Sequence, residues 1–198
     1  PFIFYFNFNT MIRFFLILIL GFLCSAEYQI KAAFQNKSKI SYLGSHPAHD
    51  WIGVSQKFKG GVVCDDNLEC LIKIQIPVES FDSANSNRDS NMLYYVESNK
   101  YKYVTFYSDS FKFDSGLLLS GKSINLNGEL DFHGIRKDIS FNVLITSDSQ
   151  FLRGQTQFDI HLSDYNVERP SLLFVPISNR VTIKCDLYCL IKEFKVGL

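Results

Sequence analysis

Residues 123–146, "SINLNGELDFHGIRKDISFNVLIT", show the clearest structural pattern in the chain. Apolar and polar residues alternate in the first half of this stretch, which places Ile124, Leu126 and Leu130 on one face. The alternation resumes at Ile139 and continues through Phe141, Val143 and Ile145. Successive side chains of a β-strand point to opposite faces, so a period of two predicts half-buried antiparallel strands.

The same alternation recurs at hairpin spacing along the rest of the chain. It is clear in 70–78, 152–162 and 181–191, and weaker in 38–43, 56–64 and 103–113. This totals eight strands, the number at which a sheet closes into a barrel with room for one small ligand. A two-sheet sandwich would give the same pattern, so periodicity alone leaves both architectures open.

Two segments break the alternation. Residues 85–98 begin with Asn and Ser, which cap helices, and carry Met92, Leu93 and Val96 at helical spacing, so we expect one short helix there. Residues 163–180 form a long connection with two prolines and an apolar patch at Leu172, Leu173 and Phe174. Long connections in compact domains are usually lids or binding loops.

The N-terminal region has the order of a secretory signal. The first methionine is Met11, and it is followed by Arg13, an apolar run and the small pair Ser25-Ala26. The apolar run is shorter than the roughly 20 residues that a membrane span needs. We therefore expect residues 1–10 to be upstream or artefactual, 11–26 to be a signal peptide, and 27–198 to be one periplasmic or secreted domain.

The cysteines raise two further questions about the exported chain. Cys24 could carry a lipid, but Leu23 before it is bulkier than the small residue expected there, so a free form is favoured. Cys64 and Cys70 flank the turn-like "DDNLE", where a disulfide across the base of a hairpin is plausible. Cys185 and Cys189 share one strand face about 13 Å apart, so we expect them to be unbridged and buried.

Composition excludes one class of partner. The formal net charge is zero and there is no basic stripe, whereas binding to nucleic acid depends on neutralising phosphates. Hydrophobic residues make up 46% of the chain, with 19 Phe and 10 Tyr. A protein this aromatic has either a dense core or an apolar cavity.

One cluster suggests metal chemistry. The heptapeptide "SHPAHDW", residues 45–51, holds His46, His49 and Asp50, and these support an alternative hypothesis of a metal-assisted hydrolase. The two histidines are three positions apart and would diverge in a strand, so they converge only in a turn at Pro47. A zinc site needs three or four ligands, and the other histidines lie in distant segments.

Other catalytic signatures are missing from the sequence. There is no "GxSxG" elbow, no cysteine with an adjacent histidine, and no phosphate loop, since "KFKGGVV" lacks the following lysine and serine. We therefore expect no enzyme activity, no catalytic residues, no bound metal and no cofactor.

The aromatic residues of the inward faces carry the alternative to catalysis. They are Phe58, Phe106, Phe132, Phe141 and Phe158, each in a separate strand pattern. Any one of them could belong to a filled core, which would make this a packed structural protein without ligand. As a set, they are also suited to lining a cavity.

The order of motifs resembles the YceI family of lipocalin-like proteins. "PVESFDSANSNRDSNML" is similar to the family's "D(T/S)xNxxRDxHL" helix start through Asp82, Asn85, Arg88, Asp89 and Leu93. "LNGELDFHGIRKDISF" resembles its "GxLTxHGVTxPV" hairpin through Gly128, Leu130, His133 and Gly134, with Asp138 in place of proline. "VESNKYKYVTF" and "SDYNVERP" resemble two further segments, with Lys102 replacing a proline and Asn166 a glycine.

The resemblance implies an extended eight-stranded antiparallel lipocalin-like barrel that holds an isoprenoid or other long amphiphile. The phenylalanines above, with Leu173 and Phe174, would then line the tunnel or cover its mouth, and Trp51 would enter the barrel wall. Arg88, Asp89 and His133 would brace the helix and hairpin instead of touching the ligand.

Elementary energetics allows this interpretation. Strands of nine or ten residues span roughly 30 Å. Burial of a twenty-carbon chain yields about 16 kcal/mol gross, before ordering and association costs. We therefore predict a carrier of a polyisoprenoid or fatty amphiphile that comes near a membrane to exchange its lipid, and we leave open whether it forms a homodimer.

Overall fold

The computed structural model describes residues 30–114, 116 and 121–194. The predicted signal peptide and Cys24 lie outside these residues, and their assignment stays a prediction. No helix in the described part of the chain has both the length and the hydropathy needed to cross a bilayer.

Ten strands of the described residues form one antiparallel sheet in the order β1-β4-β5-β6-β8-β9-β10-β13-β2-β3. Their bounds are β1 (Ile30–Ala33), β2 (Lys39–His46), β3 (His49–Ser55), β4 (Lys59–Cys64), β5 (Glu69–Pro77), β6 (Tyr103–Ser108), β8 (Lys122–Phe132), β9 (Ile135–Ser147), β10 (Phe151–His161) and β13 (Arg180–Leu190). The short β7 (Phe111–Lys112) pairs with β5, and β11 (Ser171–Leu172) forms a separate hairpin with β12 (Val175–Pro176).

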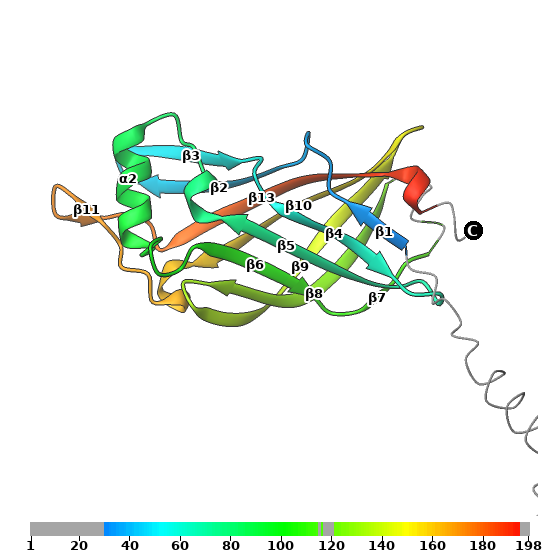
Figure 1. Cartoon of the computed structure of the whole chain (residues 1–198). Helices are drawn as coiled ribbons and strands as arrows, with labels where there is room; N and C mark the ends of the chain where they lie inside the picture. Colours follow the sequence, from blue (N-terminus) through cyan, green and yellow to red (C-terminus); the bar gives the residue numbers. More distant parts are fainter. Residues whose placement is uncertain (1–29, 115, 117–120, 195–198) are drawn as a thin grey trace, which may run out of the picture.

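The sheet curls strongly into an elongated, barrel-like tube (Figure 1). This confirms the prediction of an all-β, antiparallel, lipocalin-like fold with one helix, α2 (Ser86–Tyr95), although the number of strands differs. Residues 123–146 form the β8–β9 hairpin, which pairs from Lys122 with Ile145 to Phe132 with Ile135.

Sequence alternation predicted eight strands and missed β1 and β3, the two ends of the sheet. β1 has four residues, too few to display a period. β3 has an inverted pattern, because Gly53 and Ser55 are buried while Ile52 and Val54 are exposed. Small residues face inward there because the Tyr42 ring of β2 covers Gly53 so closely that a Cβ would lie 2.2 Å from it.

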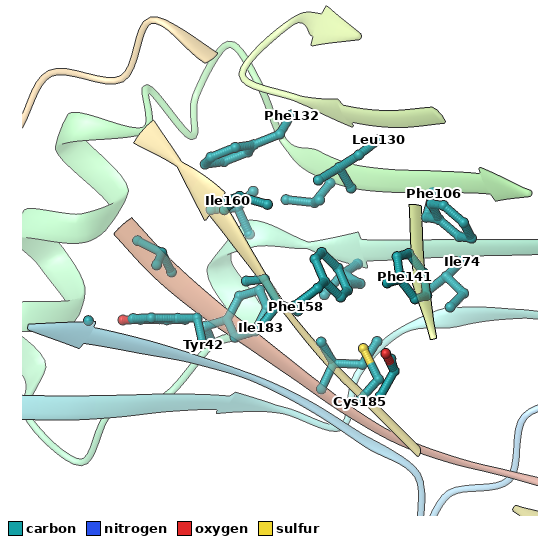
Figure 2. Close-up of a pocket in the computed structure, with 18 of the residues that line it drawn as sticks. Tyr42, Ile74, Phe106, Leu130, Phe132, Phe141, Phe158, Ile160, Ile183 and Cys185 are labelled. Atoms are coloured by element: carbon teal, nitrogen blue, oxygen red, sulfur yellow. The ribbon is translucent and has the colours of Figure 1, made fainter. Parts of the chain in front are cut away.

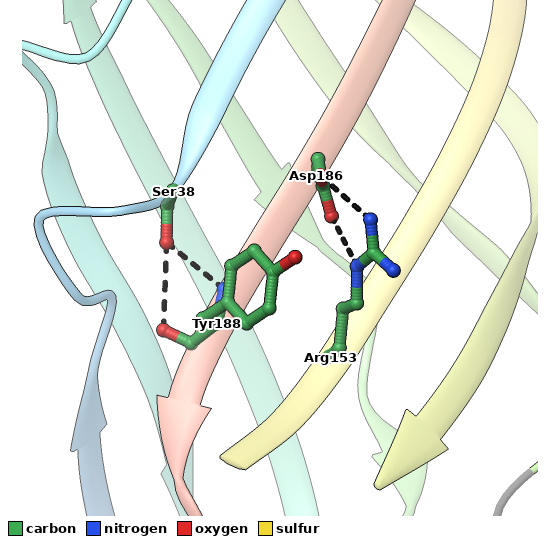
Figure 3. Close-up of polar contacts among 4 residues, drawn as sticks. All are labelled: Ser38, Arg153, Asp186 and Tyr188. Atoms are coloured by element: carbon green, nitrogen blue, oxygen red, sulfur yellow. Dashed lines mark hydrogen bonds and ion pairs between the residues drawn. The ribbon is translucent and has the colours of Figure 1, made fainter. Parts of the chain in front are cut away.

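Local contacts tie the two ends of the sheet to other parts of the tube. Val54 in β3 exchanges two backbone hydrogen bonds with Asp82, at 2.8 and 3.0 Å. On the other side, the buried Ser38 hydroxyl accepts a hydrogen bond from the Tyr188 N–H at 2.9 Å, and the Gln35 N–H donates to the Tyr188 carbonyl (Figure 3). These contacts fix the positions of the two ends, between which the described residues form no strand pairing.

One end of the tube is closed by packed apolar side chains. A second apolar core there contains Phe194, 1% exposed, whose ring stacks on Phe113 at 5.1 Å. Cys64 and Cys70 belong to the same core and form a disulfide between cross-strand partners of β4 and β5. The bridge considered from sequence is therefore present at the base of the β4–β5 hairpin.

The other end carries α2, the β2–β3 turn and the β11–β12 hairpin (Figure 1). Asn85 caps α2 by accepting a hydrogen bond from the Arg88 N–H at 3.1 Å. The Arg88 guanidinium donates to the Ser83 hydroxyl and carbonyl, both at 2.9 Å, and Asp89 accepts from the Ser83 hydroxyl at 2.5 Å. These contacts fix where the helix begins, as expected for bracing residues.

His133 braces the same end from the β8–β9 turn. Its Nδ1 donates to the Tyr165 carbonyl at 2.7 Å, and its Nε2 lies 2.9 Å from the Glu97 carboxylate just after α2. The side chain thus ties the hairpin to both the helix and the 3₁₀ turn Leu162–Tyr165.

Candidate functional site

An apolar cavity of about 580 Å³ follows the inside of the tube. This volume lies within the about 300–1,000 Å³ of small-molecule sites. Its wall consists of the inward residues of the strands, spaced two apart as the alternation requires (Figure 2). On β8 these are Ile124, Leu126, Leu130 and Phe132, and on β13 they are Val181, Ile183, Cys185, Leu187 and Cys189.

Three of the predicted phenylalanines meet in this wall. The Phe141 and Phe158 rings stack at 4.4 Å, nearly parallel, and Phe106 lies 5.4 Å from Phe141 (Figure 2). The backbone pairing of β9 with β10 covers only Leu152–Gln155 and Leu144–Ser147. Beyond these paired residues, the stacked Phe141 and Phe158 rings bridge β9 and β10. The rings therefore form the cavity wall where the two strands are no longer hydrogen-bonded to each other.

The remaining predicted residues are distributed differently. Phe132 and Trp51 also line the cavity. Phe58 does not line it and instead packs edge-on against Phe34, which does, at 6.3 Å. Leu173 and Phe174 are 83% and 100% exposed at the tip of the β11–β12 hairpin, and neither lines the cavity. Contact of any of these residues with a ligand stays a prediction.

Polar side chains reach the cavity mainly at its α2 end. They are Asn85, Asn87, Arg88, Asn91, His46, His49 and Glu168. Sequence analysis assigned Arg88 to bracing alone, but its guanidinium also lines the cavity and lies 5.9 Å from the centre of the Trp51 ring. The site is therefore amphiphilic along its axis, with an apolar body and a polar mouth.

Tyr42 is a wall residue that sequence analysis missed. Its hydroxyl is buried and has no hydrogen-bond partner among the described residues, although the Trp51 indole is nearby. Burial, with a smaller effect from the charge of Asp89, raises the pKa of Tyr42 to about 12, so the phenol stays neutral. A buried donor without a partner is costly, and a polar group of a ligand would relieve that cost. The alternation of Ile40 and Tyr42 within the predicted strand 38–43 was the available signal.

The two histidines of "SHPAHDW" face each other across the β2–β3 hairpin, with ring centres 6.2 Å apart. The Ala48 N–H donates to His46 Nδ1 at 3.1 Å, so Nε2 carries the proton and donates to the Val175 carbonyl at 3.2 Å. Both ring nitrogens of His46 are thus engaged. Among residues 30–114, 116 and 121–194, no group of three His, Cys, Asp or Glu side chains is placed to hold a metal ion.

The two remaining cysteines are free, as expected, and Cys185 faces the cavity. Burial raises the pKa of both Cys185 and Cys189 to about 12. At neutral pH both thiols are therefore protonated and behave as small apolar groups.

Solved structures with the same fold provide three comparisons. BcnA of Burkholderia cenocepacia is 21% identical, with a TM-score of 0.65 over 77% of this chain and 96% of that one. A polyisoprenoid-binding domain from Saccharophagus degradans, implicated in plant cell wall breakdown, is 16% identical, with a TM-score of 0.66 over 82% and 99%. The YceI protein of Campylobacter jejuni is 17% identical, with a TM-score of 0.55 over 70% and 83%.

These structural similarities show the fold alone. The family of this chain is established by its sequence. No curated protein matches the chain by sequence. The profile of the YceI-like domain, however, matches residues 28–189, which include α2 and all of the curled sheet except Leu190, the last residue of β13. The chain therefore belongs to the YceI-like domain family.

Proposed function

We propose that this protein carries a long-chain lipid, a polyisoprenoid or a fatty amphiphile, inside its barrel and performs no catalytic step. The observation that carries the proposal is the cavity, which is apolar along its body and polar at one end. An amphiphile has the same division. Burial at about 0.8 kcal/mol per methylene provides affinity without a charged contact.

The polar mouth indicates how the cargo would be oriented. Its chain would lie along the inward residues of β8, β10 and β13, and its head would reach the α2 end. There the Tyr42 hydroxyl lacks a partner and the Asn91 amide lines the cavity. A neutral polar head, such as an alcohol, a carboxamide or a quinone ring, would satisfy these groups.

The isoprenoid class is supported by one structural neighbour, the polyisoprenoid-binding domain of Saccharophagus degradans. We further propose that the protein acts in the periplasm or after secretion. The disulfide between Cys64 and Cys70 supports an oxidising compartment, in agreement with the predicted signal peptide.

The two alternatives are less well supported. A hydrolase that uses His46, His49 and Asp50 would need ring nitrogens free for a metal, and those of His46 are hydrogen-bonded. A packed core without ligand would leave no cavity of about 580 Å³ between the wall residues.

The first experiment is detergent-free purification of residues 27–198 from the native envelope fraction, followed by organic extraction and mass spectrometry. We expect one lipid class at near-equimolar amount. An empty protein that also fails to bind added geranylgeraniol and oleic acid would contradict the carrier function.

A matched pair of variants locates the lipid. Gly154 lines the cavity, and a Cβ there would meet only Val143 and Ile145 at 3.4 and 3.8 Å, so Gly154→Leu would fill the lumen while leaving the wall intact. Gln157 is exposed on the same strand and points outward, so Gln157→Leu is the control. We expect about tenfold weaker lipid binding for the first and no change for the second.

A further inference from the structure

We propose that the β11–β12 hairpin is a membrane-contacting tip, which enters the surface layer of a lipid bilayer while cargo passes through the nearby mouth. This inference rests on the proposed function for its purpose, and on separate observations for the contact itself.

The first observation is exposure. Four consecutive apolar residues form the tip, and Leu172, Leu173, Phe174 and Val175 are 47%, 83%, 100% and 43% exposed. Among the described residues, the other exposed large hydrophobic side chains lie on the sides of strands, as Ile52 and Leu71 do, except for Tyr94 on α2. Scattered exposed apolar residues need no explanation, whereas a contiguous projecting group marks an interaction site.

The second observation is the backbone of the turn. Leu173 and Phe174 are the two residues of a two-residue loop and have φ values of +51° and +67°. A loop with positive φ at both positions favours Asn-Gly, because larger side chains are strained there. The chain thus carries two unfavourable residues at the position where they are most exposed, so stability of the turn does not account for them.

The third observation is location. Pro170, Ser171 and Leu172 of the same hairpin also line the cavity, so the tip is continuous with the mouth. His46 Nε2 holds the hairpin through the Val175 carbonyl, and the Ser178 N–H donates to the Ser45 carbonyl at 2.8 Å. The hairpin projects beyond the tube beside α2, which carries Tyr94 at 77% exposure (Figure 1).

The size and chemistry of the tip favour a bilayer over a protein partner. A specific protein interface buries about 800 Å² on each side, more than four side chains at a hairpin tip provide. Insertion into a bilayer surface needs no matching shape, only apolar residues that leave water. A lipid that partitions out of water is moreover stored in a membrane, so a carrier must come close to one to load or deliver it.

The test uses a tryptophan at the tip. In Phe174→Trp, with phosphatidylcholine vesicles and no other protein, we expect a blue shift of the emission and quenching by brominated lipid. The wild type supplies the baseline for Trp51, the single native tryptophan. Leu71→Trp, at a 52% exposed position of β5 beside the disulfide, is the control that should not shift.

The loss-of-contact variant is Leu173→Asn with Phe174→Gly. It gives the turn its preferred residues, so the fold is retained, and it should weaken vesicle binding about tenfold or more.

The outcomes separate this inference from the carrier function. The membrane contact is overturned if vesicles do not change the emission of the Phe174→Trp variant. It is also overturned if the emission shifts with protein concentration alone, because a second copy then covers the tip. Both conclusions hold even if lipid is found in the barrel. If the indole of that variant inserts into vesicles but the protein holds no extractable lipid, the contact is supported and the carrier function is removed.

Discussion

The two ends of the barrel are built from similar apolar residues in opposite ways. At the disulfide end, Phe113 and Phe194 are buried and form the apolar end wall of the cavity, and the Cys64–Cys70 bridge is buried in the same core. At the α2 end, polar side chains line the cavity, the Tyr42 hydroxyl lacks a partner among the described residues, and Leu173 and Phe174 project outward.

This difference indicates that one end mainly stabilises the fold and that the other end serves binding. The packed end buries aromatic area and closes a covalent loop, both of which stabilise the fold. The open end has a strained turn at Leu173 and Phe174 and a polar cavity lining, and such features persist where they serve binding. Each end has one buried polar atom without a hydrogen-bond partner among the described residues, the Tyr42 hydroxyl at the open end and Glu193 Oε2 at the packed end.

The largest expected effect is at the packed end. Phe194→Ala removes a ring that is 1% exposed and stacked on Phe113, so we expect a loss of about 3–5 kcal/mol in the free energy of unfolding. Urea unfolding measures it, with Leu173→Ala as the control that changes stability by less than about 0.5 kcal/mol. An equal loss of unfolding free energy in the two variants would contradict the inference that the packed end contributes more to stability than the hairpin tip.

A second prediction concerns acid stability near the packed end. On the outer face, Arg153 donates to Asp186 through Nε at 2.6 Å and Nη2 at 2.9 Å (Figure 3). Hydrogen bonding to Arg153 lowers the pKa of Asp186, whereas burial opposes the shift. Asp186→Asn should cost about 1 kcal/mol at pH 7, a modest value because Arg153 is 36% exposed.

The pH dependence follows from the direction of the shift. A lowered carboxyl pKa means that the stabilisation is complete above the ordinary value of about 3.9 and is lost as pH falls through the folded value. The stability difference between wild type and Asp186→Asn should therefore shrink below about pH 4. A difference that stays constant down to about pH 2 would show that the ion pair contributes nothing.

At the open end, His46→Ala should loosen the hairpin. It removes the acceptor of the Ala48 N–H and the donor to Val175, so we expect a loss of about 1 kcal/mol. Hydrogen exchange should accelerate at the Ser178 and Ile177 amides, which bond within this region. His49→Ala, at an exposed neighbouring position, is the control, and identical exchange in both variants would argue against His46 as the anchor.

The smallest effect has the opposite sign. Leu173→Asn with Phe174→Gly relieves two positive-φ residues and exposes no core, so unfolding should require about 0.5 kcal/mol more. Thermal denaturation measures the gain. A destabilised variant would mean that the exposed side chains stabilise the hairpin, and their presence would then need no functional explanation.

Sequence alternation predicted the long strands well because each buries one face along its full length. Residues 123–146, 152–162 and 181–191 correspond to β8 with β9, to β10 and to β13. The helix at 85–98 is α2, and its Asn cap was readable from the sequence. The expected loop at 163–180 contains a 3₁₀ turn and the β11–β12 hairpin, whose two-residue strands are too short for a period.

The candidate site was less predictable. Phe106, Phe132, Phe141 and Phe158 line the cavity, but Phe58 lies behind Phe34, because inward parity does not say how deep a ring sits. The family resemblance implied that Leu173 and Phe174 line the tunnel or cover its mouth; both are exposed at the hairpin tip and neither lines the cavity, so their contact with a ligand stays a prediction. Arg88 and Tyr42 belong to the site because the β2–β3 hairpin lies beside α2, a contact between distant segments.

By itself, the sequence determined the all-β class, the family, the inward face of each long strand and the helix, because these depend on local periodicity and on the order of motifs. Tertiary structure alone decided the rest. It set the inverted face of β3, the contact of Ser38 with Tyr188, the apolar closed end and the polar open end, and the volume between the walls. These features depend on how far apart opposite walls are held, and no run of neighbouring residues encodes that separation.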